Sequence, residues 1–192
     1  MRSPTIASLV GAHTHAPADD LPPNSTFCIL YSKGAITVNQ LPTRKKNRLD
    51  NYDYGAPGYY FVTVCIGDKS KLFWNDVSAN VDPEHLPLTE YGKIVERFLL
   101  EIPAHYPNVR LDKYVVMPNH VHAIIQLTHK YKRVTISSIM RAWKALVTRN
   151  TTDLTWQKSF YDHVIRDERD YRRIWKYIDD NPIKWADDCY YV

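Results

Sequence analysis

The amino-acid sequence predicts an α+β domain, in which an antiparallel sheet carries two helices on one face and a third helix follows at the C-terminal end. Four short runs are rich in β-branched and aromatic residues, as strands are. They alternate with segments whose apolar residues recur at helical spacing. The order strand, helix, strand, strand, helix, strand is that of the split βαβ arrangement, which leaves the second face of the sheet free to hold a site.

The first half of this fold is predicted to hold one strand and one helix. Residues 59–66, with the sequence YYFVTVCI, are almost entirely β-branched or aromatic and indicate a buried strand. Residues 88–102 carry an apolar stripe at helical spacing, which should face the sheet. Thr89 is a suitable N-cap for this helix, and Pro103 and Pro107 should mark its exit.

The second half begins with a predicted hairpin. Residues 109–116 and 120–127 are apolar runs that flank a Pro-Asn break, so we expect two paired strands. An amphipathic helix over residues 136–149 and a strand over residues 160–166 should follow. Asp167 is expected to cap a third helix that runs to about Asp180. Asn181 and Pro182 should stop it, because the residue before a proline is disfavoured in the helical region.

The composition is that of a globular protein in a reducing compartment. The hydrophobic fraction of 44% is ordinary, and a formal charge of +4 is small enough that the placement of charge matters more than its sum. Cys28, Cys65 and Cys189 are far apart, which argues against a disulfide framework or a structural zinc site. No apolar run is long enough to cross a membrane, and no signal pattern is evident. We therefore expect a soluble cytoplasmic protein with no membrane partner.

The chain divides into two parts. Residues 1–43 contain Pro and Asp and show no periodicity, so they are expected to form a flexible extension before a domain over residues 44–192. A basic cluster of Arg44, Lys45, Lys46 and Arg48 opens that domain. Such a cluster is either a solvated linker or a contact for phosphates.

Two histidines open the second strand of the predicted hairpin. His120 and His122 are two residues apart, so their side chains should point to the same face of the sheet. Two neutral imidazoles on one face can chelate a divalent cation. The spacing alone also fits ordinary histidines that are hydrogen-bonded at the sheet surface, so both interpretations stay open.

The third helix carries a candidate nucleophile. Tyr177 lies at the border between the apolar stripe of this helix and a basic sector that includes Arg173. Asn181 follows four residues later on the same side. A tyrosine at such a border can keep its ring packed and its hydroxyl near a phosphate. It can equally be a residue that covers the edge of the core, with Asn181 as a helix terminator.

Several separated stretches together resemble one family. They are the strand PGYYFVTVCI, the hairpin LDKYVVMPNHVHAII, the helix SSIMRAWKALVTR and the C-terminal segment WQKSFYDHVIRDERDYRRIWKYIDDNPIKW. In this order they resemble the REP-associated tyrosine transposases. These are single-tyrosine members of the HUH superfamily, in which two histidines flank a bulky hydrophobic residue. The similarity covers residues 44–185.

The resemblance implies a ferredoxin-like fold that cuts and joins single-stranded DNA beside a hairpin with a Mg²⁺ or Mn²⁺ ion. His120 and His122 match the metal-binding pair, and Tyr177 matches the nucleophile that forms a 5′-phosphotyrosine. Asn181 matches the position of a third metal ligand. The protein would act as a monomer or a homodimer. Basic residues would bind the DNA, and the candidates are Arg44, Lys45, Lys46, Arg141, Lys144 and Arg173.

Two other functions remain compatible with the sequence. A split βαβ sheet can bind RNA or single-stranded DNA without catalysis, through aromatic residues on its open face. A metal-dependent nuclease could instead use water as the nucleophile, and it would leave no bond between protein and DNA.

Overall fold

The computed structural model describes residues 48–188, except residues 69, 77–80 and 83. The expected extension over residues 1–43 lies outside the described residues, and so do Arg44, Lys45 and Lys46 of the basic cluster, whereas its Arg48 is described and pairs with Asp162. The flexibility of the extension and the DNA contacts of the cluster therefore stay predictions.

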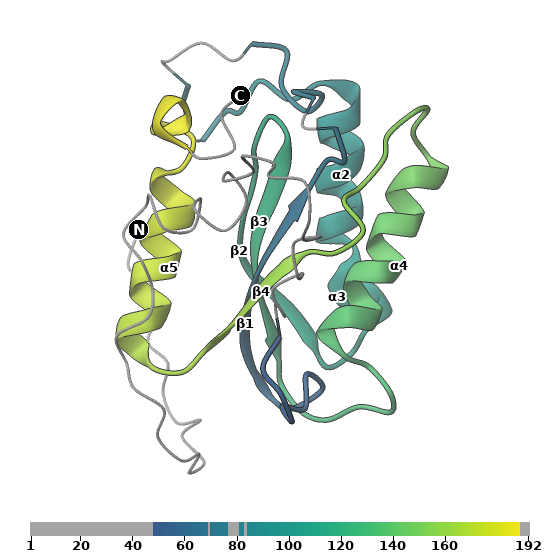
Figure 1. The fold of residues 1–192 in the computed structure, drawn as a ribbon, viewed down its shortest axis with the longest axis vertical. Coiled ribbons are helices and arrows are strands. Elements are labelled where there is room, and N and C mark those ends of the chain that lie inside the picture. The colour runs from purple at the N-terminus through teal and green to yellow at the C-terminus, as the bar shows by residue number, and fades with distance from the viewer. Residues whose placement is uncertain (1–47, 69, 77–80, 83, 189–192) are drawn as a thin grey trace, which may run out of the picture.

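The centre of the described domain is a four-stranded sheet with the order β2-β3-β1-β4 (Figure 1). Its strands are β1 (Gly58–Cys65), β2 (Val109–Val116), β3 (His120–Leu127) and β4 (Tyr161–Ile165). Each pair of neighbours is antiparallel. This order, with the crossover helices between β1 and β2 and between β3 and β4, is that of the predicted ferredoxin-like split βαβ sandwich, so the predicted fold class is confirmed.

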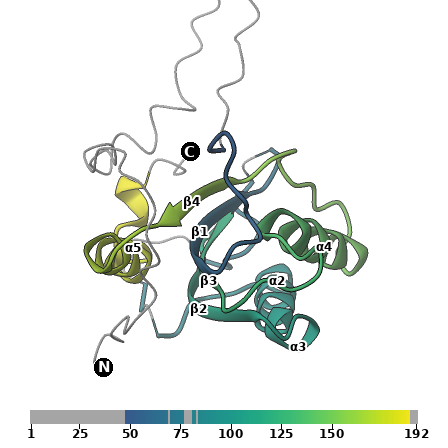
Figure 2. The same cartoon turned by 90° about the horizontal axis from the view of Figure 1, so that it is seen from below.

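The helices cover both faces of the sheet. Helix α2 (Glu90–Leu100), its short continuation α3 (Ile102–His105) and helix α4 (Ile136–Arg149) lie on one face (Figure 2). Helix α5 (Glu168–Asp180) lies on the other and leads to the 3₁₀ turn η1 (Trp185–Asp187). Within the described part of the chain, none of these helices is both long and apolar enough to cross a membrane.

The predicted caps begin the helices as expected. The Thr89 side chain accepts a hydrogen bond from the backbone N–H of Gly92 at the start of α2, and Asp167 accepts one from Asp170 at the start of α5. These side chains satisfy N–H groups that have no partner within the helix. The local sequence pattern therefore places the first turn of each helix correctly.

The predicted helix ends are confirmed, but one of the reasons for them is wrong. The first helical segment ends at His105, between Pro103 and Pro107, and Pro103 lies in the first turn of α3, where its missing N–H costs no hydrogen bond. Helix α5 ends at Asp180 as expected, but Asn181 does not leave the helical region. Asn181 keeps a helical backbone with φ −58° and ψ −42°, although Pro182 follows it. The backbone N–H of Lys184 donates to the carbonyls of Asp180 and Asn181, and these bonds hold a tight turn that outweighs the preference of a residue before proline.

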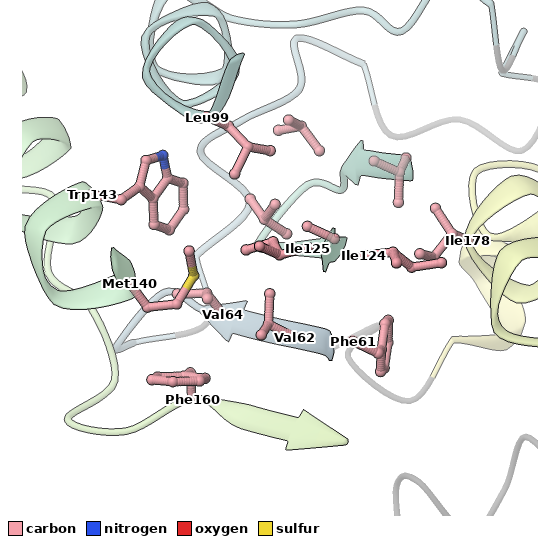
Figure 3. Packing of buried hydrophobic residues seen from close by; sticks show 14 of the residues in the cluster. Phe61, Val62, Val64, Leu99, Ile124, Ile125, Met140, Trp143, Phe160 and Ile178 are labelled. Carbon is pink, nitrogen blue, oxygen red and sulfur yellow. The ribbon is translucent and has the colours of Figure 1, made fainter. Parts of the chain in front are cut away.

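Alternate strand residues build a core on each side of the sheet. On the face of α2 and α4, Val62 and Ile125 pack near Trp143 (Figure 3). On the opposite face, Phe61 and Ile124 point toward α5, as Figure 3 shows. The apolar stripe of α5 is therefore buried against the sheet, and the second face is closed by this helix except where the site opens.

A β-bulge in β2 helps to hold α5 in place. The register of β2 against β3 shifts between Leu111 and Lys113, so Asp112 is an additional residue in the strand. The Tyr171 hydroxyl of α5 donates to the Asp112 carboxylate over 2.6 Å. Lys113 forms an ion pair with Asp179, also on α5. The bulge thus directs two successive side chains of β2 toward the helix that carries the predicted nucleophile.

Candidate active site

The two histidines lie side by side under α5. His120 and His122 are both buried, and they pair in register with Cys65 and Thr63 of β1. Their Nε2 atoms are 2.9 Å apart. The prediction that the two imidazoles share one face is confirmed, and that face is the one opposite α2 and α4.

The other ring nitrogen of each histidine is held by a neighbour. The Nδ1 atom of His120 lies 2.9 Å from the Asn119 side-chain oxygen, which can only accept, so this Nδ1 carries the hydrogen. The Nδ1 atom of His122 lies 2.8 Å from the Thr63 hydroxyl, which can accept in the same way. With both Nδ1 atoms as donors, both Nε2 atoms offer a lone pair to the same point, as in metal sites oriented by surrounding hydrogen bonds.

Burial keeps both imidazoles neutral. It lowers the pKa of His122 to about 3. It also lowers the pKa of His120 well below its ordinary value, and a charge on the adjacent His122 would lower it further. Both histidines are therefore unprotonated at neutral pH, which is the form that binds metal ions.

Tyr177 of α5 reaches the histidine pair. Its hydroxyl lies 3.3 Å from the His122 Nε2 atom. Its ring meets the edge of Phe61 with centroids 6.1 Å apart, and Phe61 in turn stacks on His122 at 5.3 Å. The ring is thus packed while the hydroxyl faces the imidazoles, as the position at the border of the apolar stripe predicted.

Two side chains are candidates for a third metal ligand. The Asp188 carboxylate and the ring nitrogens of His120 and His122 lie within 4.8 Å of one another. Asn181 is buried, and its side-chain oxygen has no hydrogen-bond partner among the described residues. Asn181, Asp188 and Tyr177 line one pocket of about 220 Å³. A buried oxygen without a partner is costly, so a cation in this pocket would suit Asn181 as well.

The donor set fits a divalent ion with near-octahedral geometry. Two nitrogens that each lie about 2.1 Å from an ion are about 3.0 Å apart at a right angle and about 3.4 Å apart at a tetrahedral angle. The separation between the His120 and His122 Nε2 atoms is 2.9 Å. This separation is compatible with two nitrogens that bind one divalent ion at about a right angle.

One predicted DNA-binding residue lies at the site. Arg173 lines the pocket together with Tyr177. Its guanidinium donates to Asp170 over 2.7 Å, and the same carboxylate is 2.7 Å from the His163 ring of β4. Half of the Arg173 side chain is exposed, so the guanidinium remains accessible from solvent.

Two other predicted DNA-binding residues lie away from the site. Arg141 and Lys144 belong to α4, on the face of the sheet opposite α5 (Figure 2). The Lys144 ammonium donates to the backbone carbonyls of Gln157 and Ser159, over 2.9 and 3.2 Å. Burial lowers the pKa of Lys144. This lysine therefore braces the segment that precedes β4, whereas Arg141 is exposed.

The sequence pattern did not predict three of the residues that lie at the histidines. Thr63 is the single polar residue in the run YYFVTVCI, and this could have marked it as a partner for a buried polar group. Asn119 directly precedes His120, but nothing in the pattern assigns it to the ring. Asp188 follows the last turn and has no periodic context, so only the folded chain brings it to the histidines.

Comparisons with known proteins identify relatives of this chain. No family model matches it. An "Uncharacterized protein" of Haemophilus influenzae is 36% identical over 173 residues, which cover 78% of this chain and 93% of that protein. A second protein of the same organism, named "Putative REP-associated tyrosine transposase", is 22% identical over 151 residues, or 71% of this chain and 77% of that protein.

A solved structure has the same fold. The protein in "Structure of the REP associates tyrosine transposase bound to a REP hairpin" superposes with a TM-score of 0.55 at 25% identity, over 76% of each chain. This chain resembles the REP-associated tyrosine transposases in both sequence and fold. The resemblance of its motifs is thus confirmed, and its four-stranded sheet and helices match the fold of these transposases. This likeness supports a transposase-like function.

Proposed function

We propose that this chain cuts and rejoins single-stranded DNA beside hairpins, through a covalent bond between Tyr177 and a 5′-phosphate. The observation that carries the proposal is the contact of 3.3 Å between the Tyr177 hydroxyl and the His122 Nε2 atom, which itself lies 2.9 Å from the His120 Nε2 atom. A nucleophile that meets two potential metal ligands is the arrangement that metal-assisted phosphoryl transfer requires. Hairpin DNA is proposed because the related transposase was solved with a REP hairpin.

His120 and His122 would hold a Mg²⁺ or Mn²⁺ ion, with Asp188 or Asn181 as the third ligand. When bound, the ion polarises a nonbridging oxygen of the scissile phosphate and offsets the negative charge that repels a nucleophile. Thr63 and Asn119 would keep the two imidazoles in the tautomer whose Nε2 atoms carry no hydrogen.

Tyr177 would act as the nucleophile. Its hydroxyl oxygen attacks phosphorus, a new phosphorus–oxygen bond forms to the tyrosine, and the bond from phosphorus to the 3′-oxygen of the preceding nucleotide breaks. The proton of the tyrosine is transferred to that 3′-oxygen, which leaves as a hydroxyl. Because the phosphotyrosine is itself a phosphodiester, a 3′-hydroxyl can reverse the attack and rejoin strands without ATP.

The packing around Tyr177 would orient this attack. Free tyrosine titrates near a pH of about 10, so the hydroxyl is a weak nucleophile that depends on accurate placement. The Phe61 ring supports the Tyr177 ring from the sheet, and the neighbouring Ile178 is buried in the core. The hydroxyl is therefore presented to the pocket with little loss of side-chain freedom in the reaction.

The test is a covalent adduct on a denaturing gel. A hairpin oligonucleotide with single-stranded flanks, labelled at its 3′ end, is incubated with protein and Mn²⁺. The 3′ fragment should migrate with the protein, and peptide mapping should place it on Tyr177. Tyr177→Phe should bind DNA and form no adduct, whereas Tyr161→Phe is the matched control, because Tyr161 also contacts the Phe61 ring from β4.

The outcomes separate the three functions. Cleavage without an adduct would indicate a nuclease that uses water, and binding without cleavage would indicate a non-catalytic module. An adduct on another tyrosine would overturn the assignment of Tyr177. We further propose that the protein acts in the cytoplasm as a monomer or homodimer, and gel filtration with light scattering distinguishes these two states.

A further inference from the structure

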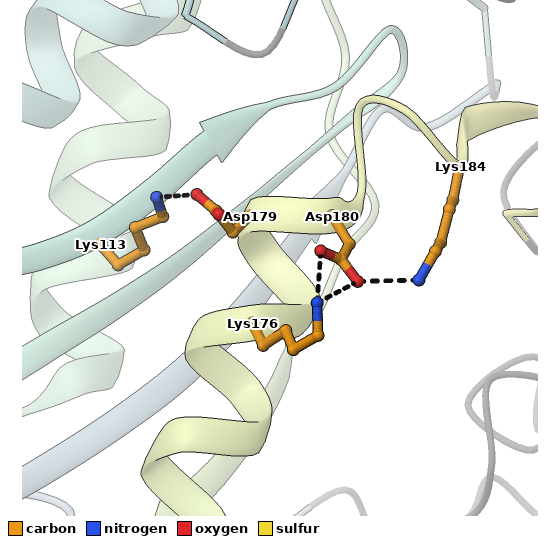
Figure 4. A network of polar contacts seen from close by, with 5 residues as sticks. All are labelled: Lys113, Lys176, Asp179, Asp180 and Lys184. Carbon is orange, nitrogen blue, oxygen red and sulfur yellow. Dashed lines mark hydrogen bonds and ion pairs between the residues drawn. The ribbon is translucent and has the colours of Figure 1, made fainter. Parts of the chain in front are cut away.

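A single carboxylate holds two lysines at the pocket beside Tyr177. The Asp180 side chain accepts hydrogen bonds from the Lys176 ammonium over 2.9 and 3.0 Å and from the Lys184 ammonium over 2.8 Å (Figure 4). All three residues line the pocket together with Tyr177 and Asn181. Two cationic groups are thus held within the space that the proposed nucleophile faces.

Asp179 and Asp180 are neighbours with different contacts. Asp179 anchors α5 to the sheet, and Asp180 takes no part in that contact. Asp179 points toward the sheet and pairs with Lys113 of β2, whereas Asp180 points away from the sheet toward the two lysines, as Figure 4 shows. The Asp180 side chain is 26% exposed, while those of Lys176 and Lys184 are 74% and 52% exposed. The carboxylate is therefore mostly covered, and the ammonium groups remain open to a ligand.

Helix stability explains this cluster poorly. Asp180 is the last residue of α5, and the last turn of that helix contains no basic residue. A carboxylate at the C-terminal end of a helix opposes the helix dipole and costs about 0.3–1 kcal/mol, while an exposed ion pair contributes only about 0.2–1 kcal/mol. The two ion pairs of Asp180 together contribute about 0.4–2 kcal/mol, which is of the same order as the cost at the helix end. Lys176 and Lys184 can therefore exchange the Asp180 carboxylate for another anion at a small cost in free energy.

The charges of the cluster match a backbone phosphate. Two ammonium groups share one carboxylate, so the three side chains carry one excess positive charge, and a phosphodiester carries one negative charge. Arg173 adds a guanidinium at the same pocket, already paired with Asp170. Asp187 and Asp188 also line the pocket, and the Asp188 carboxylate lies with the two histidines.

We propose that Lys176 and Lys184, held in position by Asp180, bind the DNA backbone phosphate adjacent to the one that Tyr177 attacks. The inference deepens the proposed function and rests on it. The lysines are positioning residues: by fixing the neighbouring phosphate they set which phosphodiester bond meets the Tyr177 hydroxyl.

The experiment measures DNA binding without cleavage. Tyr177→Phe protein in EDTA is titrated into a fluorescein-labelled hairpin oligonucleotide with a single-stranded flank, over a range of NaCl concentrations. Adding Lys176→Gln and Lys184→Gln should weaken binding roughly tenfold, as expected when one charge-assisted hydrogen bond to the DNA is removed. The slope of log K against log salt should become shallower by about 0.7 for each single-strand phosphate that the protein no longer neutralises.

A control with the same change of charge is available on α2. Lys93 pairs with Glu90 over 2.7 Å, and Arg97 is exposed on the same helix, on the opposite face of the sheet from α5. Lys93→Gln with Arg97→Gln also removes two positive charges and a helical ion pair. This variant should keep the binding constant and salt slope of its parent. Equal losses of affinity in the two double variants would reject the lysine site and leave only a general effect of charge.

A second measurement locates the phosphate. Each phosphate of the flank is replaced in turn by a neutral methylphosphonate, and every DNA is measured with and without Lys184→Gln. At the phosphate that the lysines bind, the two losses of affinity should not add, because either change removes the same interaction. That phosphate should lie next to the bond whose cleavage gives the Tyr177 adduct. Additive losses at every position would overturn the proposal, whereas a wild-type protein that forms no adduct would reject the proposed function instead.

Discussion

Thr63 offers a way to test the metal site without touching a candidate ligand. Its hydroxyl lies 2.8 Å from the His122 Nδ1 atom, and Thr63 is 2% exposed. Thr63→Val keeps the shape of the side chain and removes the acceptor. The buried Nδ1 hydrogen then loses its partner, at a cost of about 1–3 kcal/mol. His122 can avoid this cost only by moving its proton to Nε2, which removes the lone pair that faces His120.

Both responses weaken metal binding. Loss of a hydrogen bond that orients a ligating histidine lowers metal affinity about 10- to 100-fold, or about 1.4–2.7 kcal/mol. The concentration of Mn²⁺ for half-maximal adduct formation should rise by this factor in Thr63→Val, and saturating Mn²⁺ should restore the wild-type rate. Thr63→Ser keeps the hydroxyl and should resemble the wild type. Calorimetric titration with Mn²⁺ in the absence of DNA should show the same difference.

Two results would refute this reasoning. If Thr63→Val required no more Mn²⁺ than the wild type, the Thr63 hydroxyl would not orient a metal ligand. If no concentration of Mn²⁺ restored the rate while the thermal melting temperature stayed near that of Thr63→Ser, Thr63 would act on Tyr177 or the DNA rather than on the ion.

The remaining predictions concern the histidines and the N-terminal segment. His120→Ala and His122→Ala should each abolish metal-dependent cleavage and keep much of the DNA binding, which rests on backbone phosphates; cleavage at the wild-type rate would remove the metal assignment. Below a pH of about 6.5 the unfolded chain protonates both histidines while the folded protein, with the pKa of each lowered by burial, does not. The free energy of unfolding should therefore fall by about 2 kcal/mol per histidine between pH 6.5 and pH 5. Urea unfolding in EDTA measures this fall, and His120→Asn with His122→Asn should reduce it; an unchanged fall would contradict the neutral state. Removal of residues 1–40 should leave cleavage largely intact, and a folded but inactive truncation would place that segment in the site.

The fold was predictable where local pattern and tertiary packing agree. The run YYFVTVCI forms the central strand β1, and the Thr89 and Asp167 caps begin their helices where expected. The prediction for the backbone of Asn181 failed because another interaction outweighs a local preference. Asn181 remains helical before Pro182 because the backbone of Lys184 closes the turn.

The site was predictable in part for the same reason. The two-residue period of a strand places His120 and His122 on one face, and the helical stripe places Tyr177 at its border. Asp188 could not be placed, because it comes to the histidines only through the fold of the segment after α5. The packing of Lys144 against backbone carbonyls depends in the same way on residues distant in the sequence.

The bulge at Asp112 could be removed from β2 without changing the faces of the other residues of the strand. Val109 and Leu111 precede it and Tyr114 follows it, yet all three face the α2 side, because the additional residue resets the alternation of the strand. Substitution of Asp112 removes one hydrogen bond to Tyr171. Deletion of Asp112 would leave a regular strand, in which Leu111 still pairs with Ile125 and Lys113 with Ile124, so Val109 and Leu111 would stay on the α2 side. We therefore expect a chain without Asp112 to keep its sheet and its core, and to lose the hydrogen bond that β2 accepts from Tyr171 of α5.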